Sequence, residues 1–145
     1  MEKSNSLQMD VYVNYNGNCK EAFRFYETHL GGKITQMMTH RELPDSSNLP
    51  KLPEGWSDAI LHARMELGGM MLLGADIPNA EPMRSAYLTL QIETIEEAER
   101  LYKLLSADGK IFMKMESTFF AKRFAIVQDK FGTSWMILGA EMAHE

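Results

Sequence analysis

The sequence has a single cysteine, Cys19, among its 145 residues, so it cannot form an intramolecular disulfide. One thiol fits a reducing compartment, and we expect the chain to be cytoplasmic. The first ten residues lack the apolar run of a secretory signal, and no stretch approaches the ~18–20 apolar residues of a membrane span. The sequence therefore predicts no membrane partner.

Positive charge is also scarce. Fifteen Lys and Arg residues stand against twenty Asp and Glu residues, and the formal net charge is −5. The cations are scattered, which argues against a nucleic-acid partner. The sequence contains no G-x-G-x-x-G, no G-x-x-x-x-G-K-[ST] and no G-x-S-x-G, so nucleotide-phosphate loops and a serine nucleophile elbow are not predicted.

The remaining composition is that of a folded protein. Hydrophobic residues make up 45% and charged residues 24%, and the length fits a single domain over residues 1–145. Twelve methionines are many for this length. Methionine packs adaptably around irregular cavities, so these residues line a malleable pocket or reflect lineage bias, and composition does not separate the two.

The chain contains an internal repeat. An alternating stretch at 10–15 precedes a helical pattern, and the same order recurs from 87–92. The letters EAFRFY at 21–26 parallel EAERLY at 97–102, and GGKI at 31–34 parallels DGKI at 108–111. Such self-similarity indicates two copies of one supersecondary unit.

Both predicted helices have start and stop signals. Asn18 with Glu21, and Thr94 with Glu97, have the spacing of a capping box, in which the first side chain caps the first-turn amides and the glutamate reaches back. A glycine follows each helix, where a left-handed C-terminal residue is easiest to adopt.

A strand and a hairpin follow each helix. The first hairpin spans 59–74 with a Gly68-Gly69 turn, and the second spans 124–139 with a turn around 130–132. Each half therefore reads as βαβββ, with modules at 8–75 and 84–140. The predicted fold class is α+β, with two pseudo-symmetric βαβββ modules forming curved mixed sheets around a cleft.

The first module carries an insertion at 35–58. It is rich in turn formers, including Pro44, Asp45, Ser46, Ser47 and Pro50. A loop of this length is typical of a lid, a binding loop or a mobile segment. Trp56, near its end, either contacts a ligand or partner chain or anchors the loop on the core, and we weigh these alternatives equally.

Strand parity separates two faces of each predicted sheet, because neighbouring side chains point to opposite sides. We expect the apolar face to pack on the helices. The polar face is either solvated surface or the wall of a small-molecule cleft, and its mixture of aromatic and polar groups favours the cleft. The cleft candidates are Tyr12, Asn14, His62, Arg64, Tyr87 and Thr89, with Met136 as an adaptable floor.

Four segments, at 15–23, 62–64, 116–124 and 129–137, resemble the PhnB-like branch of the vicinal oxygen chelate superfamily, also called the glyoxalase/bleomycin-resistance/dioxygenase superfamily. The resemblance covers nearly the whole chain, and the block YNGNCKEAF at 15–23 begins it. It implies a paired βαβββ fold, usually a homodimer, with a ligand cleft in each curved sheet.

Metal-dependent members of this superfamily hold a divalent ion with four ligands, typically histidine and glutamate, on the first and last strands of each module. The resemblance places these positions at about Asp10, Tyr87, Leu73 and Met136. Leucine cannot ligate, and methionine suits soft metals, so we expect neither a catalytic metal nor another cofactor. A lone histidine such as His62 more often makes a hydrogen bond or a ligand contact.

Two further groups have alternative interpretations. Arg123 follows Phe119 and Phe120, so it binds an anionic ligand group in the cleft beside stacking rings, or it forms an edge-strand charge pair with the rings in the core or a dimer seam. Cys19 lies near a helix N-terminus, where a thiol can be activated, but its place on the apolar stripe favours buried packing.

These observations lead to one function hypothesis and two alternatives. The chain is expected to bind a small, partly apolar organic molecule without a catalytic metal, as a homodimer. It is alternatively a glyoxalase-like lyase or isomerase, or a dioxygenase-type enzyme, acting on a small carbonyl compound with His62 or Glu66 as general base. The third hypothesis is a drug-sequestering resistance protein. A ubiquinone-type methyltransferase, a label that some similar sequences carry, is not favoured, because no glycine-rich strand-to-helix loop is present.

Overall fold

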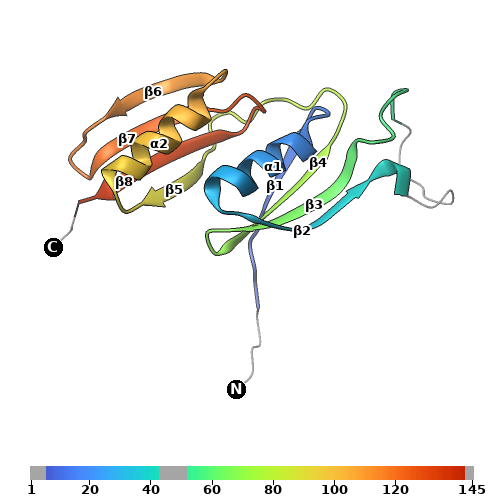
Figure 1. Ribbon diagram of the computed structural model, residues 1–145, viewed down its shortest axis with the longest axis horizontal. Helices are drawn as coiled ribbons and strands as arrows, with labels where there is room; N and C mark the ends of the chain where they lie inside the picture. The colour runs from blue at the N-terminus through green and yellow to red at the C-terminus, as the bar shows by residue number, and fades with distance from the viewer. Residues whose placement is uncertain (1–5, 43–51, 143–145) are drawn as a thin grey trace. The chain divides into compact units, whose positions relative to one another are not determined.

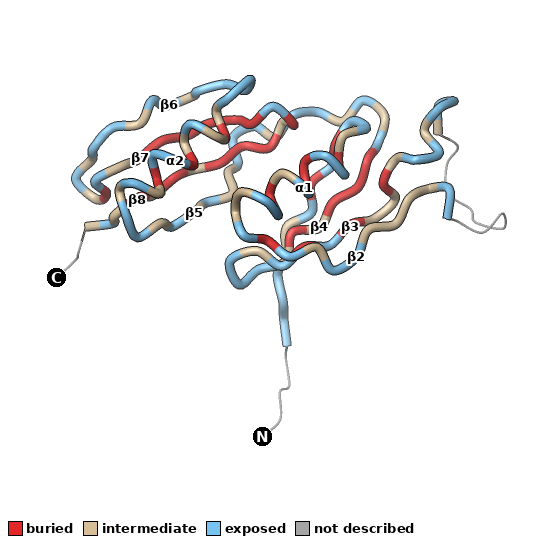
Figure 2. Tube along the Cα trace, in the orientation of Figure 1, coloured by how far each residue is buried: buried red, intermediate tan, exposed pale blue. Residues whose placement is uncertain are grey.

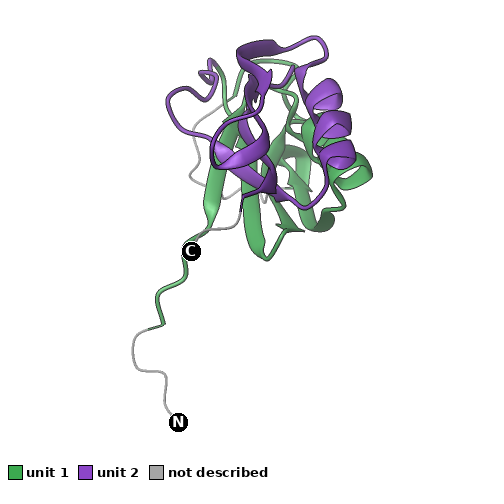
Figure 3. Ribbon diagram, turned by 90° about the vertical axis from the view of Figure 1, so that its left-hand side faces the viewer, with its two compact units in different colours: residues 1–78 green, residues 79–145 purple. Residues whose placement is uncertain are grey.

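Each half of the sequence forms one α-helix packed on a four-stranded sheet. The computed structural model describes residues 6–42 and 52–142. The chain divides into two compact units, residues 1–78 and 79–145, which are coloured separately in Figure 3. The element order confirms the βαβββ repeat, whereas a single domain over 1–145 stays a prediction.

Unit 1 is a mixed sheet with one helix and a short 3-10 turn at His40–Glu42 (Figure 1). The order across the sheet is β1-β4-β3-β2, with β1 parallel to β4 and the other pairs antiparallel. Its main elements are β1 (Val11–Tyr15), α1 (Cys19–Leu30), β2 (Lys33–Thr39), β3 (Ile60–Leu67) and β4 (Met70–Asp76).

Unit 2 repeats this topology. The order is β5-β8-β7-β6, and the first and last strands again pair in parallel. Its elements are β5 (Leu88–Ile92), α2 (Ile95–Ser106), β6 (Lys110–Glu116), β7 (Ala121–Gln128) and β8 (Ser134–Glu141). The α+β class and the duplicated mixed sheets are therefore confirmed, and a cleft enclosed by the sheets stays a prediction.

The core of each unit lies between the helix and one sheet face (Figure 2). In unit 1 a Cβ placed on Gly74 of β4 would lie 2.9 Å from the Phe23 ring. In unit 2 a Cβ on Gly139 of β8 would lie 2.5 Å from the Cβ of Ala98. Glycine at these two positions therefore allows each helix to pack close to its sheet.

The helix N-termini differ from each other. Thr94 caps α2 as predicted, accepting the Glu97 N–H at 3.2 Å, but the Glu97 carboxylate pairs with Arg100 instead of reaching back. The Asn18 side chain makes no cap hydrogen bond, so that prediction is wrong. The first-turn amide of Cys19 is bonded instead to Asp76, a buried carboxylate at the end of β4.

The helix C-termini also differ. Gly31 ends α1 with φ 78°, which confirms the predicted left-handed residue. After α2 the left-handed residue is Asp108, with φ 59°, and not Gly109. Gly109 is required for another reason, because a Cβ there would lie 2.1 Å from the Gln128 carbonyl oxygen.

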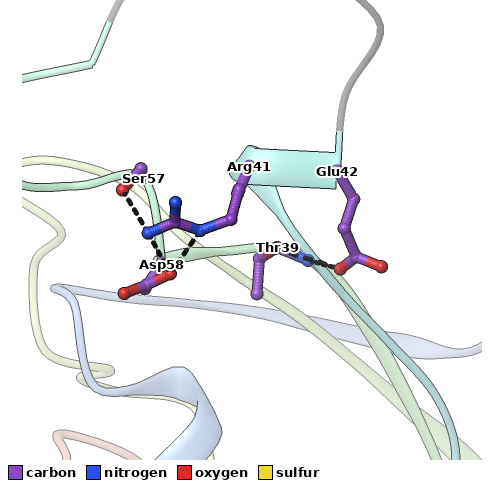
Figure 4. Close-up of polar contacts among 5 residues, drawn as sticks. All are labelled: Thr39, Arg41, Glu42, Ser57 and Asp58. Atoms are coloured by element: carbon purple, nitrogen blue, oxygen red, sulfur yellow. Dashed lines mark hydrogen bonds and ion pairs between the residues drawn. The ribbon is translucent and has the colours of Figure 1, made fainter.

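The predicted insertion begins later than expected, because β2 continues to Thr39. Residues 43–51, with Pro44, Asp45, Ser46, Ser47 and Pro50, lie outside the described residues. On either side of this segment, the Arg41 guanidinium binds the Asp58 carboxylate at 2.8 Å and the Ser57 hydroxyl at 3.1 Å (Figure 4).

Trp56 lies against the turn between β1 and α1. A Cβ placed on Gly17 would contact the Trp56 ring at 3.7 Å. The anchoring alternative therefore has a contact within unit 1, and a role in binding a ligand or partner stays a prediction.

Candidate functional site

Each sheet has a second face, opposite the one on which its helix packs, which we call its open face. In unit 1, Tyr12 lies opposite Leu73 across the ladder, and Leu73 lies opposite Arg64. Residues directly opposite each other share a face, and residues two apart along a strand do too. The structure therefore brings Tyr12, Asn14, His62 and Arg64 onto one surface, the open face of unit 1.

Tyr12 and His62 lie close together on this face. Their ring centroids are 6.3 Å apart with the planes inclined at 33°. Partial burial and, to a smaller extent, the nearby Cys19 thiol raise the pKa of the Tyr12 phenol above its ordinary value. The phenol is therefore protonated at neutral pH and can donate a hydrogen bond.

Arg64 is exposed in the middle of the same face. Its neighbours across the ladder are Leu73 on β4 and Gln36 on β2. Its guanidinium makes no ion pair or hydrogen bond with any residue in the ranges 6–42 and 52–142.

The open face of unit 2 is more apolar. Thr89 and Met136, which were both predicted to line the cleft, lie opposite each other and so share a face. Met136 also lies opposite Ile126. In the next open-face row Leu138 lies opposite Phe124. Tyr87 immediately precedes β5 and is half-buried.

Sequence reasoning missed the apolar members of this face. Phe124 and Ile126 alternate with Ala125 and Val127, so β7 is apolar on both sides and shows no period-2 signal. Phe124 is the last of three adjacent aromatic rings. The centroids of the Phe120 and Phe124 rings are 5.2 Å apart, those of Phe119 and Phe120 are 5.1 Å apart, and both pairs are edge-to-face. Stacking of these rings on a ligand stays a prediction.

A connecting segment covers one end of the open face of unit 2. The Met83 carbonyl accepts hydrogen bonds from the Gln128 amide at 2.8 Å and from the Ser134 hydroxyl at 2.6 Å. The Met83 N–H donates to the Gly132 carbonyl at 2.8 Å. These bonds satisfy two buried polar side chains, Gln128 and Ser134, whose row on this face is next to the row of Met136 and Thr89.

Arg123 does not share a face with Thr89 and Met136, so it lies apart from the other candidates of unit 2, and a ligand contact through Arg123 stays a prediction. It lies opposite Gly139, on the side where α2 packs. Its Nε donates to the Glu99 carboxylate on α2 at 3.0 Å, at the wall of a hollow of about 460 Å³. This confirms the charge pair, although β7 is an inner strand and not an edge.

The expected metal positions do not fit a hard divalent cation. The strand partners of Leu73 and Met136 are Tyr12 and Thr89, two residues after the expected Asp10 and Tyr87. None of the four paired residues offers a carboxylate or imidazole, which such ions prefer. Within the part of the chain that the structure describes, no three His, Cys, Asp or Glu side chains converge.

Cys19 is buried at the start of α1. Burial raises the pKa of its thiol, and the Asp76 carboxylate raises it further. A nucleophilic cysteine needs a lowered pKa and exposure, so the structure supports the packing alternative.

With this geometry established, the comparisons with known proteins identify the family. Residues 8–138 match the model of a family described as 3-demethylubiquinone-9 3-methyltransferase. The chain belongs to this family. It is 32% identical over 138 residues to Protein YjdN of Escherichia coli strain K12, covering 90% of this chain and 94% of that protein. The resemblance to the PhnB-like branch of the vicinal oxygen chelate superfamily is thereby confirmed.

Solved structures agree with this PhnB-like assignment. Protein PA1353 from Pseudomonas aeruginosa is 35% identical with a TM-score of 0.79, covering 92% of this chain and 98% of that one. A PhnB protein from Bacillus cereus is 25% identical with a TM-score of 0.75, covering 92% and 100%. The fosfomycin resistance protein FosX from Listeria monocytogenes, at 8% identity and a TM-score of 0.63 over 95% and 94%, shares the fold alone.

None of the helices described in this PhnB-like chain has the length and apolar character needed to cross a bilayer.

Proposed function

We propose that this PhnB-like protein binds a small, partly apolar organic molecule on the open faces of its sheets, without a catalytic metal. The observation that carries the proposal is the gathering of Tyr12, Asn14, His62 and Arg64 on one surface of unit 1. Small-molecule sites combine a mainly apolar surface with a few polar groups that fix orientation, and the half-buried Leu73 and Met38 supply the apolar component here.

The open face of unit 2 offers a second, more apolar set of contacts. Thr89 supplies a hydroxyl, and Met136 supplies a polarisable side chain that adapts to irregular ligands. Leu138 continues the apolar surface in the next row, whereas Ile126 and Phe124, which share these rows, are buried. We propose Tyr87 as a further contact, because it lies two residues before Thr89 and alternation along an extended chain puts such residues on the same side.

The solved relatives support the class of ligand. The FosX structure was determined with Mn(II) and 1S,2S-dihydroxypropylphosphonic acid, which is a small organic molecule. Another relative of the same fold is a glyoxylase/bleomycin resistance protein/dioxygenase domain from Frankia. The metal does not carry over to this proposal, because Leu73 and Met136 stand at two of the expected ligand positions.

Methionine methyl groups report directly on the proposed sites. Met38 lies opposite His62 on the open face of unit 1, and Met136 lies on that of unit 2. Met65 is buried on the helix side of unit 1 and serves as the control. We expect small aromatic fragments to shift the 13C-methyl signals of Met38 or Met136, assigned by Met→Leu variants, and to leave Met65 unchanged. Binding that shifts other methyl signals and neither of these two would overturn the proposal.

We further propose a cytoplasmic homodimer. The single buried cysteine suits a reducing compartment, and closed two-fold dimers are the commonest assembly of soluble proteins. Sedimentation equilibrium should give twice the chain mass of 16.5 kDa. A concentration-independent mass of one chain would contradict the dimer.

A further inference from the structure

We propose that the open face of unit 1 recognises an oxyanion, a carboxylate or a phosphate attached to a small apolar body, and that Arg64 anchors it. This inference rests on the proposed function of that face and specifies the chemical class of the ligand. It differs from the anion-binding alternative considered for Arg123, whose guanidinium is paired with Glu99 on the other side of its sheet.

The surroundings of Arg64 contain no compensating charge across the ladder. Leu73 lies on one side and the neutral amide of Gln36 on the other. The hydroxyl of Thr35 donates only to the main-chain carbonyl of Arg64, at 3.4 Å. Cross-strand pairs are the usual neighbours that neutralise a charge on a sheet, and here both are uncharged.

Glu66, an acidic residue on the same face, lies opposite a lysine and not opposite Arg64. Glu66 lies two residues beyond Arg64 on β3, and it pairs across the ladder with Lys33 on β2. Its other cross-strand neighbour is Met71. A residue directly across the ladder lies nearer than one two positions along the strand, so the register places Lys33 nearer to Glu66 than Arg64 is.

Four other arginines in the described residues have partners, whereas Arg24 lies exposed on α1. Arg41 pairs with Asp58 and Arg100 with Glu97, and Arg123 pairs with Glu99. The Arg84 guanidinium lies 3.9 Å from the centre of the Phe112 ring. In a chain with net charge −5, where carboxylates outnumber cations, an arginine on a sheet face without such a partner stands out.

The chemistry of the neighbouring groups agrees with an oxyanion. A guanidinium binds carboxylate or phosphate through two parallel N–H···O bonds. The protonated Tyr12 phenol and the Asn14 amide add neutral donors on the same face, and His62 adds a ring N–H. Leu73 and Met38, which are half-buried, supply an apolar surface for the body of the ligand.

Benzoate and benzamide test the inference because they share a shape and differ in charge. We expect benzoate to bind about tenfold more tightly than benzamide at low ionic strength. The affinities are measured by titrating the full chain, with calorimetry and the Met38 methyl signal as the two readouts. Phenyl phosphate, the phosphate arm, should also bind more tightly than benzamide. The preference should shrink at about 0.15 M salt, because exposed charges are screened.

Arg64→Gln removes the charge and keeps a polar side chain, and it should abolish the preference for benzoate. Arg64→Lys keeps the positive charge but loses the pair of parallel N–H donors of the guanidinium. It should therefore retain part of the preference for benzoate. Arg24→Gln, at an exposed arginine of α1, is the matched control and should leave the preference unchanged.

The outcomes separate this inference from the proposed function. If benzamide and benzoate both shift Met38 with equal affinity, the face binds small molecules and the oxyanion inference is wrong. A preference that survives Arg64→Gln in a variant with an unchanged circular dichroism spectrum also overturns it. If neither probe nor any fragment shifts Met38, the proposed function of this face itself fails.

Discussion

The Asp76 carboxylate at the end of β4 accepts a hydrogen bond from the main-chain N–H of Cys19, at 2.9 Å. The same oxygen accepts the Gly17 N–H at 2.9 Å, and the other oxygen accepts the Ile60 N–H at 2.8 Å. One buried carboxylate thus connects the start of α1, the turn after β1 and the start of β3. It holds together the strands whose open face carries the proposed site.

We predict that Asp76→Ala destabilises the protein by about 3 kcal/mol, because it leaves three main-chain N–H groups without their acceptor. Asp76→Asn should cost less, since it retains one carbonyl oxygen. Urea unfolding measures both. The control is Asp58→Ala, which breaks an exposed ion pair and should cost under about 1 kcal/mol. Equal losses at the two positions would contradict the role given to Asp76.

Cys19 should make the stability of the protein fall at alkaline pH. Its thiol has a raised pKa in the folded state, whereas the pKa of a cysteine in the unfolded chain is about 8.5. Below that pH both states are protonated and the thiol has no effect. Above it the unfolded state loses the proton first, so the free energy of unfolding decreases by up to about 1.4 kcal/mol per pH unit.

The measurement for Cys19 is the free energy of unfolding at about pH 7 and about pH 9.5, compared with Cys19→Ala. The wild-type protein should lose more stability than the variant over this interval. A thiol reagent should also react with Cys19 only on the unfolding timescale. Rapid modification of the folded protein would show that the thiol is accessible and that this account of it is wrong.

Gly139→Ala should push α2 away from β8, because the added Cβ would lie 2.5 Å from that of Ala98. We expect a loss of about 1–3 kcal/mol, typical of overpacking. Ala98→Gly alone costs about 1 kcal/mol of helix propensity, but it should relieve the clash in the double variant. A double variant whose loss equals the sum of the single losses would exclude this close contact.

The Arg123–Glu99 pair should contribute little to stability and nothing to ligand binding. Its side chains are 31% and 49% exposed, so a double-mutant cycle should give a coupling below about 1 kcal/mol. Arg123→Gln should leave the affinity for benzoate unchanged, in contrast to Arg64→Gln. A loss of affinity in Arg123→Gln would favour the alternative in which this residue binds the anionic ligand.

The duplicated fold could be predicted from the sequence because local signals agreed. The Gly68-Gly69 turn, the Thr94 cap and the helical stripes each depend on residues near in sequence. The Asn18 cap failed because its competitor, Asp76, lies 57 residues away from Cys19, and periodicity contains no trace of that contact. After α2 the left-handed residue is Asp108, and Gly109 is required instead because the Gln128 carbonyl, from a strand distant in sequence, lies so close to it.

The candidate site was predicted in part for the same reason. Parity placed Tyr12, Asn14, His62 and Arg64 on one face, because alternation along β1 and β3 is clear. Parity gave no help at Arg123, since β7 is apolar on both faces around it. Only the ladder register, with Arg123 opposite Gly139, assigns that side chain to the helix side.

The central claim is that a small molecule binds on the open faces, and a crystal structure of the full chain with bound benzoate tests it most directly. We predict that the benzoate ring contacts Leu73 and Tyr12 and that its carboxylate is bound by the Arg64 guanidinium. Benzoate found only in the hollow beside Glu99 and Tyr102, with the open faces bare at saturating concentration, would contradict it.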